Sequence, residues 1–387
     1  MEFSLFYFSG DGSKTQKKKY NLLIEGAKFA DENDFSAVWV PERHFHPFGG
    51  LYPNPSLTCT ALAMITKQIQ LRAGSVVMPL HNPARVAEEW SVVDNFSDAR
   101  VALAFASGWT MDDFVLSTSS HANRKETMWK GIQTVQKLWE GEQVELKDAT
   151  GKTFEVKTFP RPIQSKLPIW VVCQSSATYI EAGKIGANVL TSLLGGTLEE
   201  VAPQISLYRQ SLEQNGYDPK AGKVAIMIHT FVGEDFDEVK EAAREPFYNY
   251  LKTHINLLES LARDAGIKVD LKKFTEADIN SLLRFAYEGW LKGRTLIGSK
   301  TTCMQMIERL KKAGVDEVAC LIDFNDNFDA VMASLPHLKD LKNMCNLEKE
   351  EVVFSSLQFV SARNIINCVA CVTRRVILRI DNCLVIR

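Results

Sequence analysis

The sequence predicts an α/β fold, a (β/α)8 TIM barrel, from three observations. Short apolar runs typical of buried strands alternate with longer segments that have the helical period. The run of strand–helix units reaches eight, the number that closes such a barrel. Polar side chains gather where the apolar runs end, at the edge where parallel α/β proteins build their sites. A doubly wound open sheet is the alternative, but it would not easily absorb eight units in a row.

The elements follow one another along the whole region. Residues 20–33 illustrate a helix, because Tyr20, Leu23, Ala27 and Ala30 recur at helical spacing. The expected strands are 3–8, 36–40, 69–77, 100–106, 169–173, 188–193, 224–232 and 317–323. The expected helices are 20–33, 55–67, 82–96, 124–139, 178–185, 198–215, 236–251, 300–313 and 328–341. A polar surface hairpin is expected at 144–162, and a polar, weakly periodic insert at 253–293, between strands seven and eight.

Composition narrows the class of protein. The 387 residues contain 45 basic and 47 acidic side chains, with no basic stripe, which argues against a nucleic-acid surface. The N-terminus lacks the pattern of a signal peptide, and no apolar run approaches the roughly 18 residues that cross a bilayer. The eight cysteines are scattered singly and no metal-binding motif is present, so we expect reduced thiols in a cytoplasmic protein.

Two domains are expected. Residues 1–345 hold the barrel with its insert. Residues 346–387 are rich in β-branched residues and lack glycine and proline, so we expect an appendage of unknown role, poorly ordered. Its lone C-x-x-C, Cys368 to Cys371, has no second pair to complete a zinc site.

The second expected strand ends on a cluster of polar side chains. Glu42, Arg43, His44 and His46 follow the apolar run within six residues. A salt-bridged loop is the plain interpretation of this cluster. The ends of other strands carry similar segments, at 74–83, 106–109, 174–178 and 193–196, and together they favour a site.

The exit of the fifth strand suits a phosphate. Ser175 and Ser176 open a helix, whose positive end attracts anions, although a serine there is more often only an N-cap. Ser107 and Gly108 form a small turn that backbone could use to approach a ligand, and Arg124 could add a cation. The residues alone therefore predict a barrel that holds a phosphorylated ligand beside bases and a carboxylate, without naming the reaction.

Four stretches resemble the bacterial-luciferase-like flavin monooxygenases over residues 1–341. They are 35–49 (FSAVWVPERHFHPFG), 73–85 (AGSVVMPLHNPAR), 100–109 (RVALAFASGW) and 167–186 (LPIWVVCQSSATYIEAGKIG). Their wording is most similar to the subgroup associated with polyketide and nonribosomal-peptide assembly lines. The resemblance implies FMN at the carboxyl end of the barrel.

It also implies roles for individual residues. The phosphate would contact Gln174, Ser175, Thr178 and Arg124, with backbone at Gly108 and Trp109. The turn at Ser75 and Val76 would hold a non-proline cis peptide under the flavin ring, with Ala106 beneath its reactive edge. Ser107 stands where luciferase has a phosphate arginine. The substrate pocket would include His81, Asn82, Leu194 and Gly195.

The catalytic position differs from that of luciferase. Luciferase has Glu-His-His where this chain has Glu42, Arg43 and His44, so the catalytic imidazole falls on Arg43 and the base is lost or moved to His44. Light emission from a long-chain aldehyde is therefore not expected, whereas monooxygenation is. These three residues would hold and protonate a peroxide formed at C4a of the flavin.

The resemblance further implies reaction partners. FMNH2 would come from a separate flavin reductase, because no nicotinamide fingerprint follows a strand. The substrate would be a small molecule or a chain bound to a carrier protein, and the insert would act as a lid. Dimers are common in the family, so a homodimer is one expected assembly. The alternatives are an oxidoreductase dependent on the deazaflavin F420, a non-catalytic flavin-binding relative and, most weakly, a flavin-free phosphosugar barrel.

Overall fold

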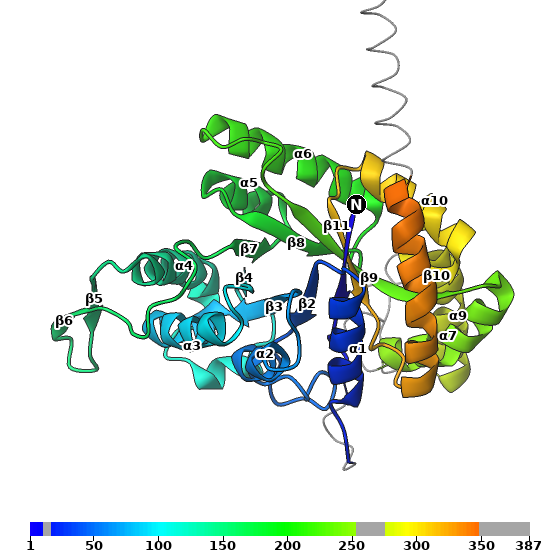
Figure 1. Ribbon diagram of the computed structural model, residues 1–387, viewed down its shortest axis with the longest axis horizontal. Coiled ribbons are helices and arrows are strands. Elements are labelled where there is room, and N and C mark those ends of the chain that lie inside the picture. Colours follow the sequence, from blue (N-terminus) through cyan, green and yellow to red (C-terminus); the bar gives the residue numbers. More distant parts are fainter. Residues whose placement is uncertain (11–16, 253–274, 348–387) are drawn as a thin grey trace, which may run out of the picture. The chain divides into compact units, whose positions relative to one another are not determined.

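The structure, a computed structural model, describes residues 1–10, 17–252 and 275–347 (Figure 1). The chain divides into two compact units, Met1–Lys339 and Asp340–Arg387. All but eight residues of the second unit lie outside the described ranges, so the appendage expected at 346–387 falls almost entirely outside them. The boundary at 345/346 therefore stays a prediction.

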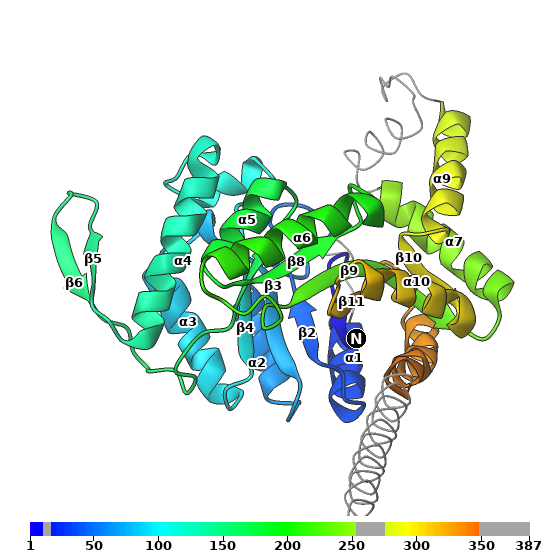
Figure 2. The same ribbon diagram turned by 90° about the horizontal axis from the view of Figure 1, so that it is seen from above.

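Eight parallel strands close into a barrel in the first unit (Figures 1 and 2). β1 pairs with both β2 and β11, and β9 pairs with both β8 and β11, so the ring has no free edge. This confirms the (β/α)8 prediction. The barrel strands are β1 (Glu2–Phe6), β2 (Ala37–Val40), β3 (Gln70–Val77), β4 (Val101–Ala106), β7 (Ile169–Val172), β8 (Asn188–Ser192), β9 (Val224–Gly233) and β11 (Glu317–Leu321).

Helices surround this barrel. Apolar faces drive their packing: in α4, for example, Met128, Ile132, Val135 and Trp139 are all buried. The α-helices are α1 (Asn21–Glu32), α2 (Pro55–Ala63), α3 (Pro83–Phe96), α4 (Arg124–Glu140), α5 (Ser176–Lys184), α6 (Leu198–Gln214), α7 (Phe236–Lys252), α9 (Glu276–Leu291) and α10 (Lys300–Lys312). Short 3-10 turns occupy η1 (Met78–Leu80), η2 (Asp112–Leu116) and η3 (His121–Asn123), and residues 328–347 are also helical.

The amino-terminal half of the barrel interior contains a buried ion pair. Nη1 of Arg72 lies 2.9 and 3.0 Å from the carboxylate oxygens of Glu317. Ser4 and the indole of Trp39 also donate to this carboxylate, and the Arg72 guanidinium lies 4.7 Å from the ring centres of Trp39 and Trp170. All of these side chains are buried. This network fills one end of the barrel and leaves the carboxyl end for a ligand.

The hairpin expected at 144–162 is confirmed. β5 (Val144–Lys147) and β6 (Thr153–Val156) pair antiparallel, and Gly151 in their turn has a φ of +85°. Figure 1 shows the hairpin projecting away from the barrel.

The insert differs from the prediction. Its described part contains α9, a regular helix that begins at a capping box formed by Thr275 and Asp278. A further strand, β10 (Thr295–Ser299), pairs with the end of β9 beyond the reach of β11. The expectation of a weakly structured insert is therefore wrong for its second half. The first half, residues 253–274, lies outside the described residues, and so does most of the expected lid.

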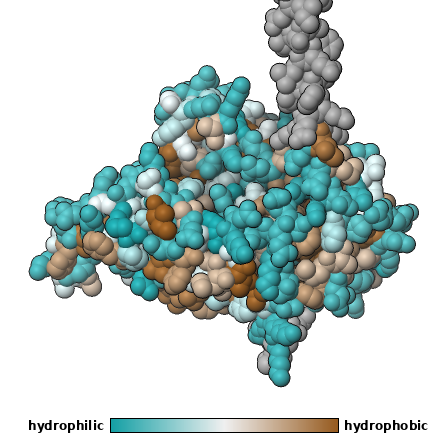
Figure 3. Space-filling view, in the orientation of Figure 1, coloured by the Kyte–Doolittle hydropathy of each residue, from teal (hydrophilic) through white to brown (hydrophobic). Residues whose placement is uncertain are grey.

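The described cysteines agree with reduced thiols. Cys59, Cys173, Cys303, Cys320 and Cys345 are free and buried. Within the described ranges, no helix has the length and apolarity needed to cross a membrane. The face of the molecule shown in Figure 3 is mostly hydrophilic, with small hydrophobic areas between the polar side chains.

Candidate functional site

A cavity of about 530 Å³ opens at the carboxyl ends of the barrel strands. Its wall comes from seven of the barrel strands or the loops that follow them and from one face of α4, as expected for a site in this fold. The predicted residues that line it are Glu42, Arg43, Ser75, Ala106, Ser107, Gly108, Trp109, Arg124, Gln174, Ser175, Thr178 and Leu194. The tertiary structure thus brings twelve of the seventeen predicted site residues to one cavity.

Glu42 is the centre of a hydrogen-bond network at one end of this cavity. Its Oε1 lies 2.8 Å from Nε2 of His44 and 2.7 Å from Nε2 of His81, and its Oε2 accepts from the Val77 amide at 2.7 Å. Burial alone would raise the pKa of Glu42, but the two imidazoles and the amide bring that pKa below its ordinary value. Burial would likewise lower the pKa of His81, but the bond to Glu42 raises it above its ordinary value. A carboxylate with charge-assisted bonds to two imidazoles can hold and exchange protons.

Arg43 lies beside this network among aromatic rings. Its guanidinium carbon is 5.1 Å from the ring centre of Phe8, 5.3 Å from that of Phe48 and 5.1 Å from that of Trp109. These distances permit cation–π attraction. Burial lowers the pKa of Arg43, and Asp113 and Tyr250 oppose that shift, so the side chain stays charged.

The opposite end of the cavity collects hydroxyl groups and cations. Ser175 is the N-cap of α5 in an extended conformation, yet its hydroxyl caps no backbone amide and instead lies 3.0 Å from the hydroxyl of Thr178. Arg124 is the first residue of α4 and donates from Nη1 to the carbonyl of His121 at 2.9 Å, which holds the side chain at the cavity wall. The N-cap interpretation of Ser175 is therefore correct for its backbone, while its hydroxyl remains in the cavity wall.

The floor of the cavity is formed where β3 and β4 end. The peptide between Gly74 and Ser75 is cis, one bond before the position expected at Ser75 and Val76, and the register of β3 shifts there. Val76 is buried and does not line the cavity, so its contact with a ligand stays a prediction. Gly108 has a φ of +80°, and a Cβ there would lie 2.9 Å from Cγ1 of Val77, so a side chain would not fit without movement.

Four other predicted residues do not line the cavity. His44 and His81 contact Oε1 of Glu42, which does line the cavity. Asn82 caps α3, because its side-chain oxygen accepts from the Ala84 amide at 2.9 Å, and it does not line this cavity, so its place in the substrate pocket stays a prediction. Gly195 follows Leu194 but is not among the lining residues. The sequence does not reveal which way each residue of a loop faces, so it could not distinguish these residues from the neighbours that do line the cavity.

The prediction missed several lining residues on α4. Lys125, Met128 and Trp129 contribute to the wall together with Arg124. The spacing of four between Arg124 and Met128, and between Lys125 and Trp129, places these pairs on neighbouring strips of one helix surface. That pattern was available in the sequence, and it adds Lys125 as a second cation beside Arg124 in the cavity wall.

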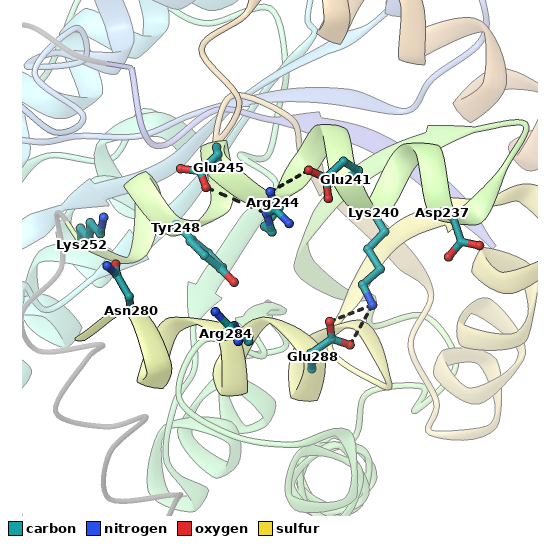
Figure 4. A pocket seen from close by; sticks show the side chains of 10 residues that line it. All are labelled: Asp237, Lys240, Glu241, Arg244, Glu245, Tyr248, Lys252, Asn280, Arg284 and Glu288. Atoms are coloured by element: carbon teal, nitrogen blue, oxygen red, sulfur yellow. Dashed lines mark hydrogen bonds and ion pairs between the residues drawn. The ribbon is translucent and has the colours of Figure 1, made fainter. Parts of the chain in front are cut away.

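A larger cavity of about 780 Å³ lies between α7 and α9 (Figure 4). Its charged side chains pair with one another: Lys240 contacts Glu288 at 2.7 Å, and Arg244 contacts Glu241 at 2.7 Å. Self-paired surface charges of this kind form a solvated cleft. The strand ends therefore provide the better candidate for an active site. No group of side chains suited to holding a metal ion is found in the parts of the chain that the structure describes.

A sequence model of the luciferase-like monooxygenases matches residues 1–317. The chain belongs to this family. It is thus a flavin-dependent oxidoreductase, as the resemblance predicted.

Individual relatives show how far the likeness extends. The oxygenase component of a flavin-dependent trigonelline monooxygenase from Acinetobacter baylyi is 26% identical, over 87% of this chain and 93% of its own length. The oxygenating constituent of 3,6-diketocamphane monooxygenase from Pseudomonas putida, solved with FMN, superposes with a TM-score of 0.69 at 18% identity, over 86% of this chain and 97% of that one. An F420-dependent secondary alcohol dehydrogenase superposes at 0.64 and 18% identity, over 88% and 97%. The fold is thus shared by proteins with two kinds of flavin.

Proposed function

We propose that this luciferase-like monooxygenase binds FMN in the cavity at the barrel mouth and uses FMNH2 and O2 to oxygenate an organic substrate. One observation carries the proposal: the same cavity has cations and two hydroxyl-bearing residues at one end and the carboxylate of a carboxylate–imidazole network at the other. Reduced FMN would supply the electrons that activate O2.

The residues at the α5 end fit a phosphate. The Ser175 and Thr178 hydroxyls face the cavity together with the amino end of α5, whose dipole favours an anion. Arg124 and Lys125 add positive charge from α4. Gln174 also lines this end and is held by a bond from its side-chain amide to Ser192 at 3.2 Å. Gly108 allows the turn after β4 to pack closely against Val77 of β3 in the cavity wall, because a Cβ there would lie 2.9 Å from Cγ1 of Val77.

The network at the other end would control protons. Because Oε1 of Glu42 contacts both imidazoles, a proton lost by one can be recovered through the shared oxygen. His81 is 32% exposed and can exchange protons with water, whereas the side chain of His44 is nearly buried. His44, Arg43 and Glu42 are therefore our proposed catalytic residues, and His81 holds Glu42 in place.

The partners follow from the same proposal. The relative from Acinetobacter is named as an oxygenase component, which supports a separate flavin reductase as the source of FMNH2 for this chain. The resemblance of the sequence to the assembly-line subgroup supports a substrate that is bound to a carrier protein, with a free small molecule as the alternative.

Flavin binding tests the phosphate end. We expect Arg124→Met to weaken FMN binding about tenfold or more, the loss of one charge-assisted hydrogen bond. Riboflavin, which lacks the phosphate, should bind wild type and variant equally. Lys137→Met, an exposed cation in the last turn of the same helix, is the control. Equal losses for FMN and riboflavin would contradict this placement of the phosphate.

Oxygen reactivity tests the activity. The protein is mixed with FMNH2 without oxygen, O2 is admitted, and the flavin absorbance is followed by stopped flow. Reoxidation much slower than that of free FMNH2 supports a monooxygenase. Reoxidation at the free rate favours a binding-only role or F420, which the dehydrogenase with the same fold uses. Hydride exchange with F420, together with O2 consumption no different from that of free FMNH2, would establish the F420-dependent role.

A further inference from the structure

The guanidinium of Arg43 has no acceptor for its N–H groups in the described part of the chain. The residue is 9% exposed, and its Nη1 is fully buried without a hydrogen-bond partner. The side chain lines the cavity at the barrel mouth. Buried guanidinium groups are normally paired, because an arginine offers five donors and keeps its charge. An unpaired one in a ligand cavity therefore indicates an acceptor that the ligand brings.

Nearby carboxylates do not fill this role. Both oxygens of Glu42, the preceding residue, are occupied by His44, His81 and the Val77 amide. Asp113 is close enough to influence the pKa of Arg43, but no ion pair joins them. Oδ1 of Asp113 is itself buried without a hydrogen-bond partner, so this second carboxyl is not bonded to Arg43 either. Among the described residues, no carboxylate therefore forms an ion pair or hydrogen bond with Nη1 of Arg43.

The surroundings of Arg43 favour a flat ligand. Phe8, Phe48 and Trp109 surround the guanidinium and can attract its charge, but their rings accept no conventional hydrogen bonds from it. Trp109 is 57% exposed at the cavity mouth, so its ring also offers a surface on which an incoming planar group can stack. The opposite end of the cavity has its own cations, Arg124 and Lys125, for a phosphate.

We propose that Arg43 binds a carboxylate of the substrate, and that the substrates of this enzyme are planar, carboxylate-bearing molecules. The fork of two N–H donors matches the two oxygens of a carboxylate, which gives both charge and orientation. The aromatic residues then hold the body of the substrate, and its reacting carbon is presented to the flavin side of the cavity. This inference rests on the proposed function, because it assumes that the phosphate end is occupied by FMN.

Binding of benzoate against benzamide tests the proposal. The two probes have the same ring and differ in charge. Calorimetric titration is carried out on protein saturated with oxidised FMN. We expect benzoate to bind at least about tenfold more tightly than benzamide in wild type. Arg43→Met should remove this preference, and Arg43→Lys should retain only part of it, since lysine keeps the charge without the fork. Arg85→Met, which alters a 68% exposed arginine on α3, should behave as wild type.

The outcomes separate this proposal from the proposed function. FMN affinity is measured first, and a protein that fails to bind FMN refutes the proposed function; the titrations then run on the FMN-free protein. Equal affinity for benzoate and benzamide, or a preference that survives Arg43→Met, overturns the assignment to Arg43. If benzoate displaces FMN, it binds at the phosphate end of the cavity. That outcome also overturns the assignment of the carboxylate site to Arg43.

Discussion

Glu42→Gln tests whether the carboxylate network is held by charge. The variant keeps the shape of the side chain but removes the charge that His44, His81 and the Val77 amide share. A charge-assisted hydrogen bond contributes about 1 kcal/mol more than a neutral one, so three bonds lose about 3 kcal/mol. His81 is partly exposed, which reduces its share, and we expect a loss of about 2 kcal/mol in the free energy of unfolding.

The pKa shifts of Glu42 and His81 determine how the stability loss in Glu42→Gln depends on pH. The pKa of Glu42 is lowered in the folded protein, so its contribution is present above the ordinary value of 4.5 and is lost as pH falls through the folded value. The pKa of His81 is raised, so its contribution is present below the ordinary value of 6.5 and is lost as pH rises through the folded value. The difference between wild type and variant should therefore be largest between pH 4.5 and 6.5.

Urea unfolding followed by tryptophan fluorescence measures this difference at several pH values. Glu88→Gln is the control, because this residue of α3 is 43% exposed and lies 3.9 Å from Arg85, so it should cost less than about 0.5 kcal/mol. If the difference in unfolding free energy between wild type and Glu42→Gln is constant from pH 4 to pH 9, the reasoning is refuted. The titrations of Glu42 and His81 would then not depend on the hydrogen bonds between them.

Three further variants probe other parts of the molecule. Glu317→Ala leaves Arg72 charged and unpaired inside the barrel and should cost about 3 to 5 kcal/mol in urea unfolding; a loss below about 1 kcal/mol would contradict the buried ion pair. Gly108→Ala brings a Cβ within 2.9 Å of Val77 at a φ of +80°, which strains the turn. FMN should therefore bind more weakly in a fluorescence titration. Unchanged affinity would mean that this turn does not touch the flavin. His44→Ala should keep FMN but release hydrogen peroxide in place of product, and a product yield equal to wild type would remove His44 from the proposed catalytic set.

Much of the fold was predictable because strand and helix periods are local properties. All eight barrel strands, the hairpin and the helices around the barrel follow from apolar spacing and turn residues. α9 was missed although Thr275 and Asp278 form a capping box and Leu283, Tyr287 and Trp290 recur at helical spacing. β10 has only five residues and pairs with the end of a longer strand, so its short apolar run gave too weak a signal.

The sequence by itself determined which segments end at the barrel mouth, because parallel strands place their carboxyl ends at one edge. It therefore predicted the place of the cavity and twelve of the 25 residues that line it. Only the tertiary structure decided which polar groups meet: His81 reaches Glu42 across 39 positions of sequence, and Arg43, beside that carboxylate, remains without an acceptor. Such contacts depend on side-chain directions and on the packing of loops from different strands. Local spacing does not encode these contacts. Glu42 and Arg43 are therefore adjacent in sequence, yet the carboxylate has three hydrogen-bond partners and Nη1 of the guanidinium has none.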